Sequence, residues 1–189
     1  AALQFMQDLV LVDESAYYHD GYLDDEFNAG NTAMFFATVA TIPWLSDERH
    51  NWGAAPVPAG TVQAAVVQGT DIALFKQASE EEQRAAWRFV KYLTSPEVNA
   101  RWAVGSGYLP IRDSAAASSV YQEHVNSAPE KYKAGVDQLH HAKFDPGLAA
   151  WFDARTFITE AVEKALILGT SPQEALVEAA DRTRAALGE

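Results

Sequence analysis

The sequence contains no cysteine, which excludes a disulfide framework, a thiolate nucleophile and a cysteine-ligated metal. It also lacks any apolar run long enough to span a bilayer. Basic residues are scarce, because 14 Lys and Arg stand against 26 Asp and Glu, for a formal net charge of −12. Nucleic acids and anionic membranes are bound through basic patches, so this balance argues against both as partners. The acidity itself is explained by solubility alone.

The short motifs of several enzyme classes are absent as well. We find no P-loop, dinucleotide fingerprint, nucleophile elbow or zinc-protease motif. His140 and His141 are adjacent, and neighbours on a helix point to different sides, so they make a poor metal-binding pair. We therefore predict no catalytic residue, no metal and no cofactor, with all five histidines at the surface or hydrogen-bonded.

What the chain does contain is the composition of a folded protein. Hydrophobic residues make up 48% and charged residues 21%, which is close to the average for globular domains. A chain of 189 residues can bury one good core or two small ones.

The most informative stretch begins at Val66. Apolar runs rich in Val, Ile and Phe lie on both sides of Gly69-Thr70-Asp71, which predicts a strand interrupted by a polar step, extending to Phe75. Gly69 would let a backbone approach a ligand closely, with the Thr70 hydroxyl and the Asp71 carboxylate beside it. The alternative is a bulge with solvated polar residues.

Capped helices are the clearest local features. Ser79 and Glu82 form a capping box for a helix from Glu80 to Leu93, and Ser171 with Glu174 repeats the pattern before a last helix. A strong amphipathic helix is predicted over Trp151–Leu168. The residues expected on the buried faces are Ala86, Phe89, Val90 and Leu93 in the first helix, and Phe157, Ile158, Ala161, Val162, Ala165 and Leu168 in the amphipathic one.

A second polar and aromatic group follows a short apolar run. Residues 32–37 are predicted to form a buried strand, and Thr38, Thr41 and Trp44 come next, at the start of a helix. Hydroxyls and free backbone N–H groups at a helix start suit a polar ligand, and Trp44 offers an apolar plate. A capping threonine and a core tryptophan are the alternative.

Four passages together carry a family resemblance. They read FNAGNTAMFF at 27–36, AAWRFVKYLTSPE at 85–97, GYLPIR at 107–112 and GTSPQEAL at 169–176. The chain resembles extracellular solute-binding protein family 1, the sugar and glycerol-3-phosphate type of ABC importer substrate-binding protein, in its C-terminal half. The resemblance implies an α/β fold, the periplasmic-binding-protein type II fold. This chain would supply mainly the C-terminal lobe, helix-rich with a few strands.

The resemblance also implies how the chain is divided. Residues 1–66 and 113–189 would form the first and last parts of the C-terminal lobe, and residues 67–112 would cross over to the N-terminal lobe. The family's N-terminal half is absent from this sequence. The crossover section should therefore expose apolar surface, covered by a missing segment, another chain or a domain swap.

The implied function is capture of a small carbohydrate outside the membrane and delivery to ABC permease subunits, with no enzymatic activity. The protein would be periplasmic or extracellular, and a lipid anchor is one mode of attachment. Proteins hold sugars by placing aromatic rings against their C–H faces and by bonding their edges with hydroxyl, amide and carboxylate groups. Gln68 and Asp71 could add contacts of the second kind. The candidate ligand-binding residues are Thr38, Thr41, Trp44, Gly69, Thr70, Tyr108 and Trp151. For Trp151, packing between the two last helices is an equal alternative.

The class of ligand has two alternatives. Relatives that bind glycerol phosphate carry an arginine shortly after the Gly-Leu that matches Gly147-Leu148, where this chain has Ala149 and Ala150. This departure favours a neutral oligosaccharide over glycerol-3-phosphate or another sugar phosphate or polyol ester. Arg155 or Arg112 could substitute for the missing guanidinium.

Two other function classes fit parts of the sequence. A glycoside hydrolase would use a carboxylate pair, for which Asp24-Asp25-Glu26 and Glu80-Glu81-Glu82 are the candidates. Solvated or helix-terminal charge explains both runs equally simply. A helical interaction module for another protein is the third possibility, and a ligand-induced rise in melting temperature would separate it from a binding protein.

Overall fold

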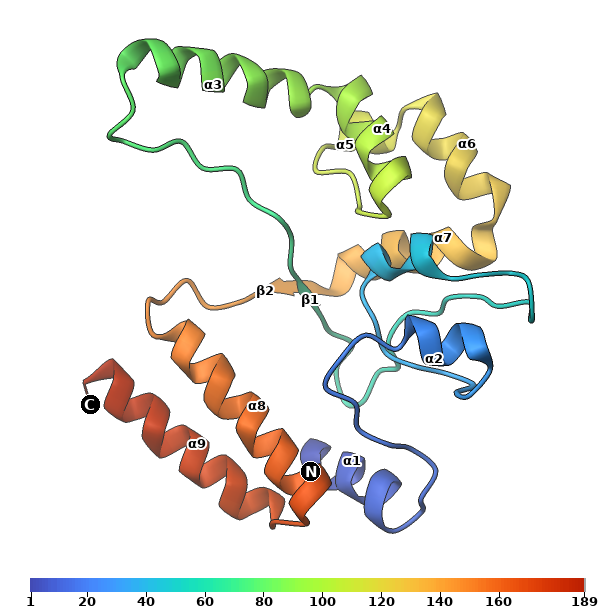
Figure 1. Ribbon diagram of the computed structural model, residues 1–189, viewed down its shortest axis with the longest axis vertical. Helices are drawn as coiled ribbons and strands as arrows, with labels where there is room; N and C mark the ends of the chain where they lie inside the picture. Colours follow the sequence, from blue (N-terminus) through green and yellow to red (C-terminus); the bar gives the residue numbers. More distant parts are fainter. Residues whose placement is uncertain (189) are drawn as a thin grey trace. The chain divides into compact units, whose positions relative to one another are not determined.

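Helices dominate the computed structural model, which describes residues 1–188 and divides into two structural units (Figure 1). Unit 1 comprises Ala1–Tyr22 and the residues from Asp145 onward, and unit 2 comprises Leu23–Phe144. Over the described residues, none of the helices is both long enough and apolar enough to cross a membrane.

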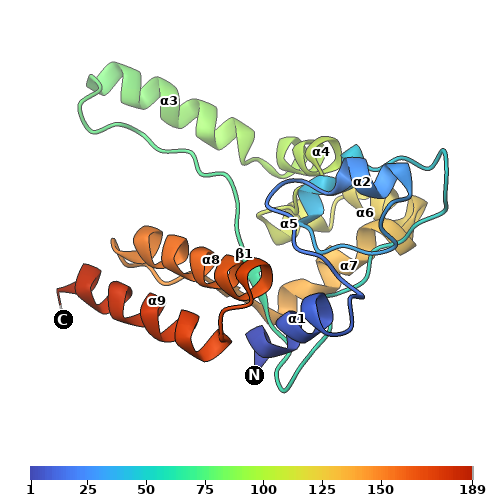
Figure 2. The same cartoon turned by 60° about the horizontal axis from the view of Figure 1, so that its bottom comes forward.

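Unit 1 is built from α1 (Ala2–Leu11), α8 (Trp151–Leu168) and α9 (Pro172–Leu187). The two long helices lie side by side in both ribbon views (Figures 1 and 2), with Ala161, Ala175 and Ala179 buried between them. Gly169 ends α8 in the left-handed conformation, with φ of 69°, which the absence of a Cβ permits. The predicted amphipathic helix is therefore confirmed with its bounds.

The buried face of α8 differs from the predicted one. Ala154, Ala161, Ala165 and Leu166 are buried, whereas Ile158 and Leu168 are 41% and 73% exposed. The reason is that α1 packs Leu3 against Ala165 and Leu166. The buried face of α8 therefore includes Leu166, which contacts α1 and lies beside the predicted face.

One polar side chain is buried at the same junction. The Gln7 amide donates hydrogen bonds to the carbonyls of Ala165, at 2.8 Å, and Thr170, at 2.9 Å. These bonds satisfy the amide and tie α1 to the C-terminal end of α8.

Unit 2 places its core among short helices. Ala100, Ala103, Ala115 and Tyr121 are buried together. The elements are α2 (Asp24–Ala29), η1 (Val39–Trp44), β1 (Ala65–Val67), α3 (Glu80–Leu93), α4 (Pro96–Ser106), α5 (Asp113–Ala116), α6 (Ser119–Ser127), α7 (Pro129–Gln138), η2 (Leu139–His141) and β2 (Ala142–Phe144).

The sheet of the described residues has two parallel strands, β1 and β2, with Val66 opposite Lys143. One strand prediction is therefore wrong, and a second is wrong in part. Residues 32–37 form no strand, and Met34 and Phe36 are 86% and 78% exposed. The strand predicted to reach Phe75 stops at Val67. A strand needs a hydrogen-bonding neighbour, and neither run has one among the described residues.

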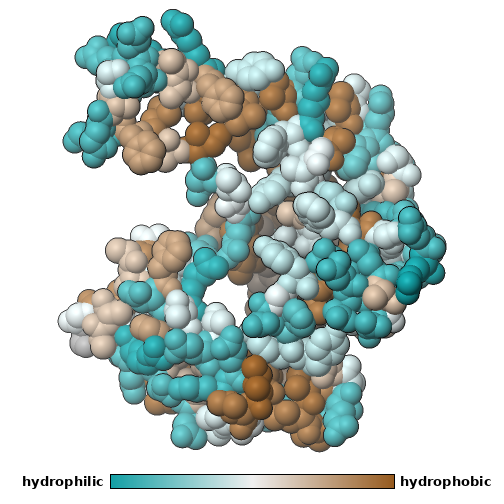
Figure 3. Space-filling view, viewed as in Figure 1, coloured by the Kyte–Doolittle hydropathy of each residue, from teal (hydrophilic) through white to brown (hydrophobic). Residues whose placement is uncertain are grey.

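Helix α3 is confirmed in its capping box and bounds, because the Ser79 hydroxyl accepts from the Glu82 N–H while the Glu82 carboxylate accepts from the Ser79 N–H at 2.8 Å. Its predicted buried face is wrong for this structure. None of its residues is buried, and Phe89 is 56% exposed. Helix α3 extends beyond the packed helices of unit 2 in Figures 1 and 2, and apolar side chains gather along it in Figure 3.

Candidate ligand-binding surface

Three of the predicted ligand residues lie on or next to η1. Thr38 precedes this 3₁₀ helix with an exposed side chain that makes no capping hydrogen bond, and its carbonyl accepts from the Thr41 N–H at 3.0 Å. Trp44 is the last residue of the element and is 71% exposed. The helix start is confirmed as a 3₁₀ turn, and Trp44 is an open aromatic face rather than a core residue.

Helix α4 ends directly against this 3₁₀ turn. Gly107 caps α4 with φ of 76°, and a Cβ built on it would lie 2.8 Å from Pro43 Cδ and 2.9 Å from the Val39 carbonyl oxygen. A side chain would not fit there, so the absence of one lets the chain pass close to η1. The residue that follows is Tyr108, another predicted ligand contact.

Tyr108 also contacts the polar step after β1. The Thr70 hydroxyl lies 3.2 Å from the Tyr108 hydroxyl, within hydrogen-bonding distance. Gly69 and Thr70 are exposed, and a Cβ on Gly69 would meet no atom within 4 Å, so the backbone there is open to an approaching molecule. The structure thus brings Thr70 and Tyr108 together from segments 38 residues apart in the sequence.

A small cavity lies behind this surface. Its volume is about 20 Å³, which is room for about one water molecule and far too little for a sugar. His124 stacks against Tyr132 with ring centroids 4.0 Å apart, and burial lowers the pKa of His124 and raises that of Tyr121. The lining residues are Val39, Ile42, Ala103, Gly107, Tyr108, Leu109, Tyr121, His124 and Tyr132. These side chains support the surface from behind rather than enclose a ligand.

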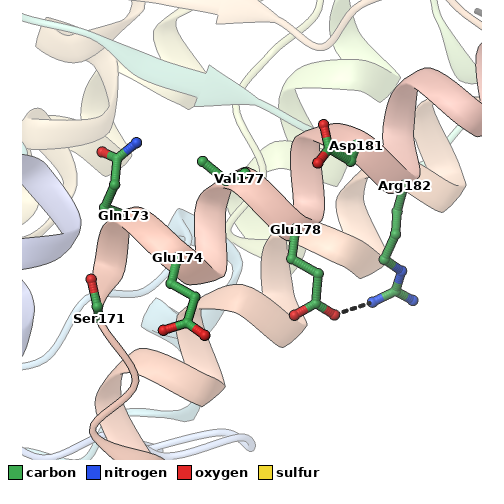
Figure 4. A pocket seen from close by; sticks show the side chains of 7 residues that line it. All are labelled: Ser171, Gln173, Glu174, Val177, Glu178, Asp181 and Arg182. Carbon is green, nitrogen blue, oxygen red and sulfur yellow. Dashed lines mark ion pairs between the residues drawn. The ribbon is translucent and has the colours of Figure 1, made fainter.

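A hollow in unit 1 has a different character. It measures about 600 Å³ and is lined by side chains of α9, which Figure 4 shows from close by. Glu178 and Arg182 form an ion pair of 3.8 Å within it. Its lining residues are Ser171, Gln173, Glu174, Val177, Glu178, Asp181 and Arg182. All of them come from one helix and its N-cap, whereas ligand sites have walls that converge from several elements.

Trp151 belongs to unit 1, while the other six predicted residues belong to unit 2. It is the first residue of α8, is half-buried, and its indole Nε1 is buried without a hydrogen-bond partner among the described residues. The two arginines named as phosphate ligands both have neighbours. Arg155 lies 3.9 Å from Asp145, and Arg112 donates to the Thr94 hydroxyl at 3.4 Å.

Three residues of the acidic runs considered for hydrolysis have structural roles. Glu82 completes the capping box, and two hydrogen bonds from Ser79 lower its pKa. Glu80 pairs with Arg84 at 3.1 Å. Glu26 accepts from the Asn31 amide at 2.8 Å, next to the left-handed Gly30 that ends α2.

Sequence reasoning missed residues that hold η1 in place. Val39 contacts both α4 and α7, and Gly135 lies at the second of these contacts. A glycine inside the helical pattern of residues 129–138 was the available signal, since such a position weakens a helix and calls for a packing reason.

A sequence profile of the bacterial extracellular solute-binding protein family matches residues 1–129 of this chain. The chain therefore belongs to the bacterial extracellular solute-binding protein family, whose members act outside the cytoplasmic membrane.

Among curated proteins, the chain is similar to the sn-glycerol-3-phosphate-binding periplasmic protein UgpB of Salmonella typhimurium, at 26% identity over 84% of this chain and 38% of that protein. UgpB of Pectobacterium atrosepticum is 25% identical over 98% of this chain and 44% of its own length. The chain thus spans less than half the length of these curated relatives.

Solved structures show the same fold. UgpB from Mycobacterium tuberculosis in complex with glycerophosphocholine superposes with a TM-score of 0.87 at 23% identity, over 99% of this chain and 48% of that one. Maltose-bound MalE3 of T. maritima gives 0.78 at 25% identity, over 97% and 49%. The predicted fold class, a helix-rich part of a periplasmic-binding-protein fold, is confirmed.

Proposed function

We propose that this chain forms part of the solute-capturing component of an ABC importer, which takes up a sugar or a glycerophosphate-type ligand and delivers it to permease subunits. Family membership supports a binding role, the similar curated proteins are named as binding proteins, and the similar solved structures hold bound glycerophosphocholine and maltose. Glu26, Glu80 and Glu82 have structural roles, which leaves fewer carboxylates for the pair that a glycosidase would need.

Within that class we favour a neutral oligosaccharide. The observation that carries this choice is the 3.2 Å contact between the Thr70 and Tyr108 hydroxyls, beside the open backbone at Gly69. Paired hydroxyls with an exposed peptide N–H can bond the edge of a sugar ring, and the exposed indole of Trp44 can cover an apolar face. Maltose in the MalE3 structure is a ligand of this kind.

Glycerol-3-phosphate or a related ester is the alternative. It is favoured by the names of the UgpB relatives and by the glycerophosphocholine of the Mycobacterium tuberculosis complex. A phosphate needs a free cationic side chain. Ala149 and Ala150 stand where the family's arginine is expected, and Arg155 lies near the Asp145 carboxylate, which leaves Arg112 as the candidate for a phosphate contact.

The lobe assignment follows as part of the proposal. Residues 67–112 belong to the N-terminal lobe of the two-lobed protein, and residues 1–66 and 113–189 to the C-terminal lobe. The exposed apolar side chains along α3, which include Trp87 at 53%, Phe89 at 56% and Tyr92 at 64%, support a partner surface for this section. In its absence, self-association or a swap would cover them. The protein is anchored by lipid or free outside the membrane.

Calorimetric titration of the intact protein with maltose, sn-glycerol 3-phosphate and glycerophosphocholine tests the proposal. We expect binding of maltose, weakened by Thr70→Val about five-fold, since one hydrogen bond contributes about 1 kcal/mol. Thr156→Val is the matched control, because its hydroxyl bonds the Phe152 carbonyl within α8. Binding of the phosphate esters alone would overturn the neutral-sugar preference, and binding of none of the three would contradict the assigned ligand classes.

A further inference from the structure

Gly135 lies at a position where glycine lowers helix stability. It lies inside α7, and a glycine in a helix interior is about 1 kcal/mol less favourable than alanine. Its backbone is not among the positive-φ glycines, so the conformation would accept any residue. A local backbone requirement therefore does not explain it.

Close packing does explain it. A Cβ built on Gly135 would lie 2.5 Å from Val39 Cγ1 and 3.4 Å from Leu109 Cδ2. The first distance is shorter than real Cβ contacts allow, so α7 could not approach η1 this closely with an alanine there. Val39 is the first residue of η1, directly after Thr38.

A second glycine, Gly107 at the end of α4, packs against the same η1 turn. The Cβ that Gly107 lacks would fall 2.9 Å from the Val39 carbonyl and 2.8 Å from Pro43 Cδ. Two helices thus approach η1 at positions without side chains. Thr38, Thr41 and Trp44 lie on or beside the turn that these contacts hold.

We infer that Gly135 is a positioning residue for the ligand surface: its missing side chain lets α7 fix η1, and with it Thr38 and Trp44, relative to Tyr108. The inference rests on the proposed function for its consequence in binding. Its structural content, that Gly135 sets the position of η1, is independent of any ligand.

The clash in a Gly135→Ala variant has two ways to relax. The η1 turn can move away, or Val39 can rotate about χ1. Valine is β-branched and stiff at χ1, and the neighbouring cavity of about 20 Å³ offers little room for a rotated methyl group. We therefore expect the turn itself to move.

Backbone hydrogen exchange of the η1 peptide, measured by mass spectrometry on the intact protein without ligand, tests this. Gly135→Ala should raise the exchange rate of residues 39–44 about ten-fold. Adding Val39→Ala, which removes the clashing methyl, should restore the slow rate. Gly105→Ala is the control, because a Cβ there meets no atom within 4 Å and should leave η1 unchanged.

Unchanged η1 exchange in a folded Gly135→Ala protein would overturn the inference, and so would a failure of Val39→Ala to restore it. Titrations with maltose and glycerophosphocholine form the second arm, where Gly135→Ala should weaken binding about ten-fold and the double variant should recover it. If the unsubstituted protein binds neither probe, the assigned ligand fails, while the exchange data still decide the role of Gly135.

Discussion

Helices α8 and α3 look alike in the sequence and behave differently in the structure. Both carry apolar residues at helical spacing, yet α8 buries Ala154, Ala161, Ala165 and Leu166, and α3 buries none of its residues. Helix α8 has α9 and α1 as neighbours within its unit, and its partners supply small residues such as Ala175 that allow close approach. Periodicity thus predicts that a helix has an apolar face, and a neighbouring element decides whether that face is buried.

Truncating one apolar side chain in each helix should give the largest difference. Leu166→Ala should lower the free energy of unfolding by about 2–5 kcal/mol, because Leu166 is 3% exposed and its loss leaves a cavity. Phe89→Ala in α3 should change it by about 0.5 kcal/mol in the 189-residue chain, as at an exposed site. Urea unfolding measures both, and equal losses would mean that α3 is packed in solution.

Replacing an alanine by leucine should also destabilise α8 more than α3. Ala161→Leu should destabilise by about 1–3 kcal/mol, because Ala161 is 2% exposed between α8 and α9 and overpacking forces the helices apart. Ala85→Leu on exposed α3 is the matched change and should stay within about 0.5 kcal/mol. A loss of more than 1 kcal/mol at Ala85 would contradict the open face.

Substitutions at the N-cap residues of α3 and α9 should change stability by a smaller amount. Ser79→Ala should cost about 1 kcal/mol of α3 stability, which corresponds to about five-fold faster amide exchange in its first turn. Ser171→Ala before α9 should have a smaller effect, because Ser171 makes no side-chain capping bond. The reverse order in an exchange experiment would show that the capping box is not formed.

The smallest expected effect is the loss of stability at low pH. Hydrogen bonds lower the pKa of Glu160, from Arg182, and of Glu82, from Ser79. A lowered folded-state pKa means that the stabilisation is fully present above the ordinary carboxyl pKa and is lost as the pH falls through the lowered value. Glu160 links α8 to α9, so its protonation should weaken unit 1, whereas protonation of Glu82 should fray the start of α3 alone.

NMR titration of the two carboxyl groups provides the measurement for this pH effect. Arg182→Met should return the pKa of Glu160 towards its ordinary value and leave that of Glu82 in place. An unshifted Glu160 in the unsubstituted protein would show that the pair is broken in solution.

Local chemistry made the helices predictable. The capping box at Ser79 and the bounds of α8 both follow from a few neighbouring residues. The strands were not predictable in this way. The apolar runs at 32–37 and 72–75 have strand composition, but pairing depends on a distant partner, and β1 finds one in β2 whereas these runs do not.

The residue types of the candidate surface could be predicted from the sequence, but the packing that holds η1 in place could not. Thr38, Trp44, Thr70 and Tyr108 were named from hydroxyls, aromatic rings and family motifs, and the Thr70–Tyr108 contact joins two of those segments. The fit of η1 against Gly107 and Gly135 depends on the distances between three elements, which no local pattern contains. Whether the seven named residues bind a ligand stays a prediction.

Hydrogen exchange with and without saturating maltose shows where on the chain the ligand lies. We predict that maltose slows exchange together in the peptides that contain Trp44, Thr70 and Tyr108, and leaves the peptides of α9 unchanged. Maltose binding that protects none of these three segments would contradict the account.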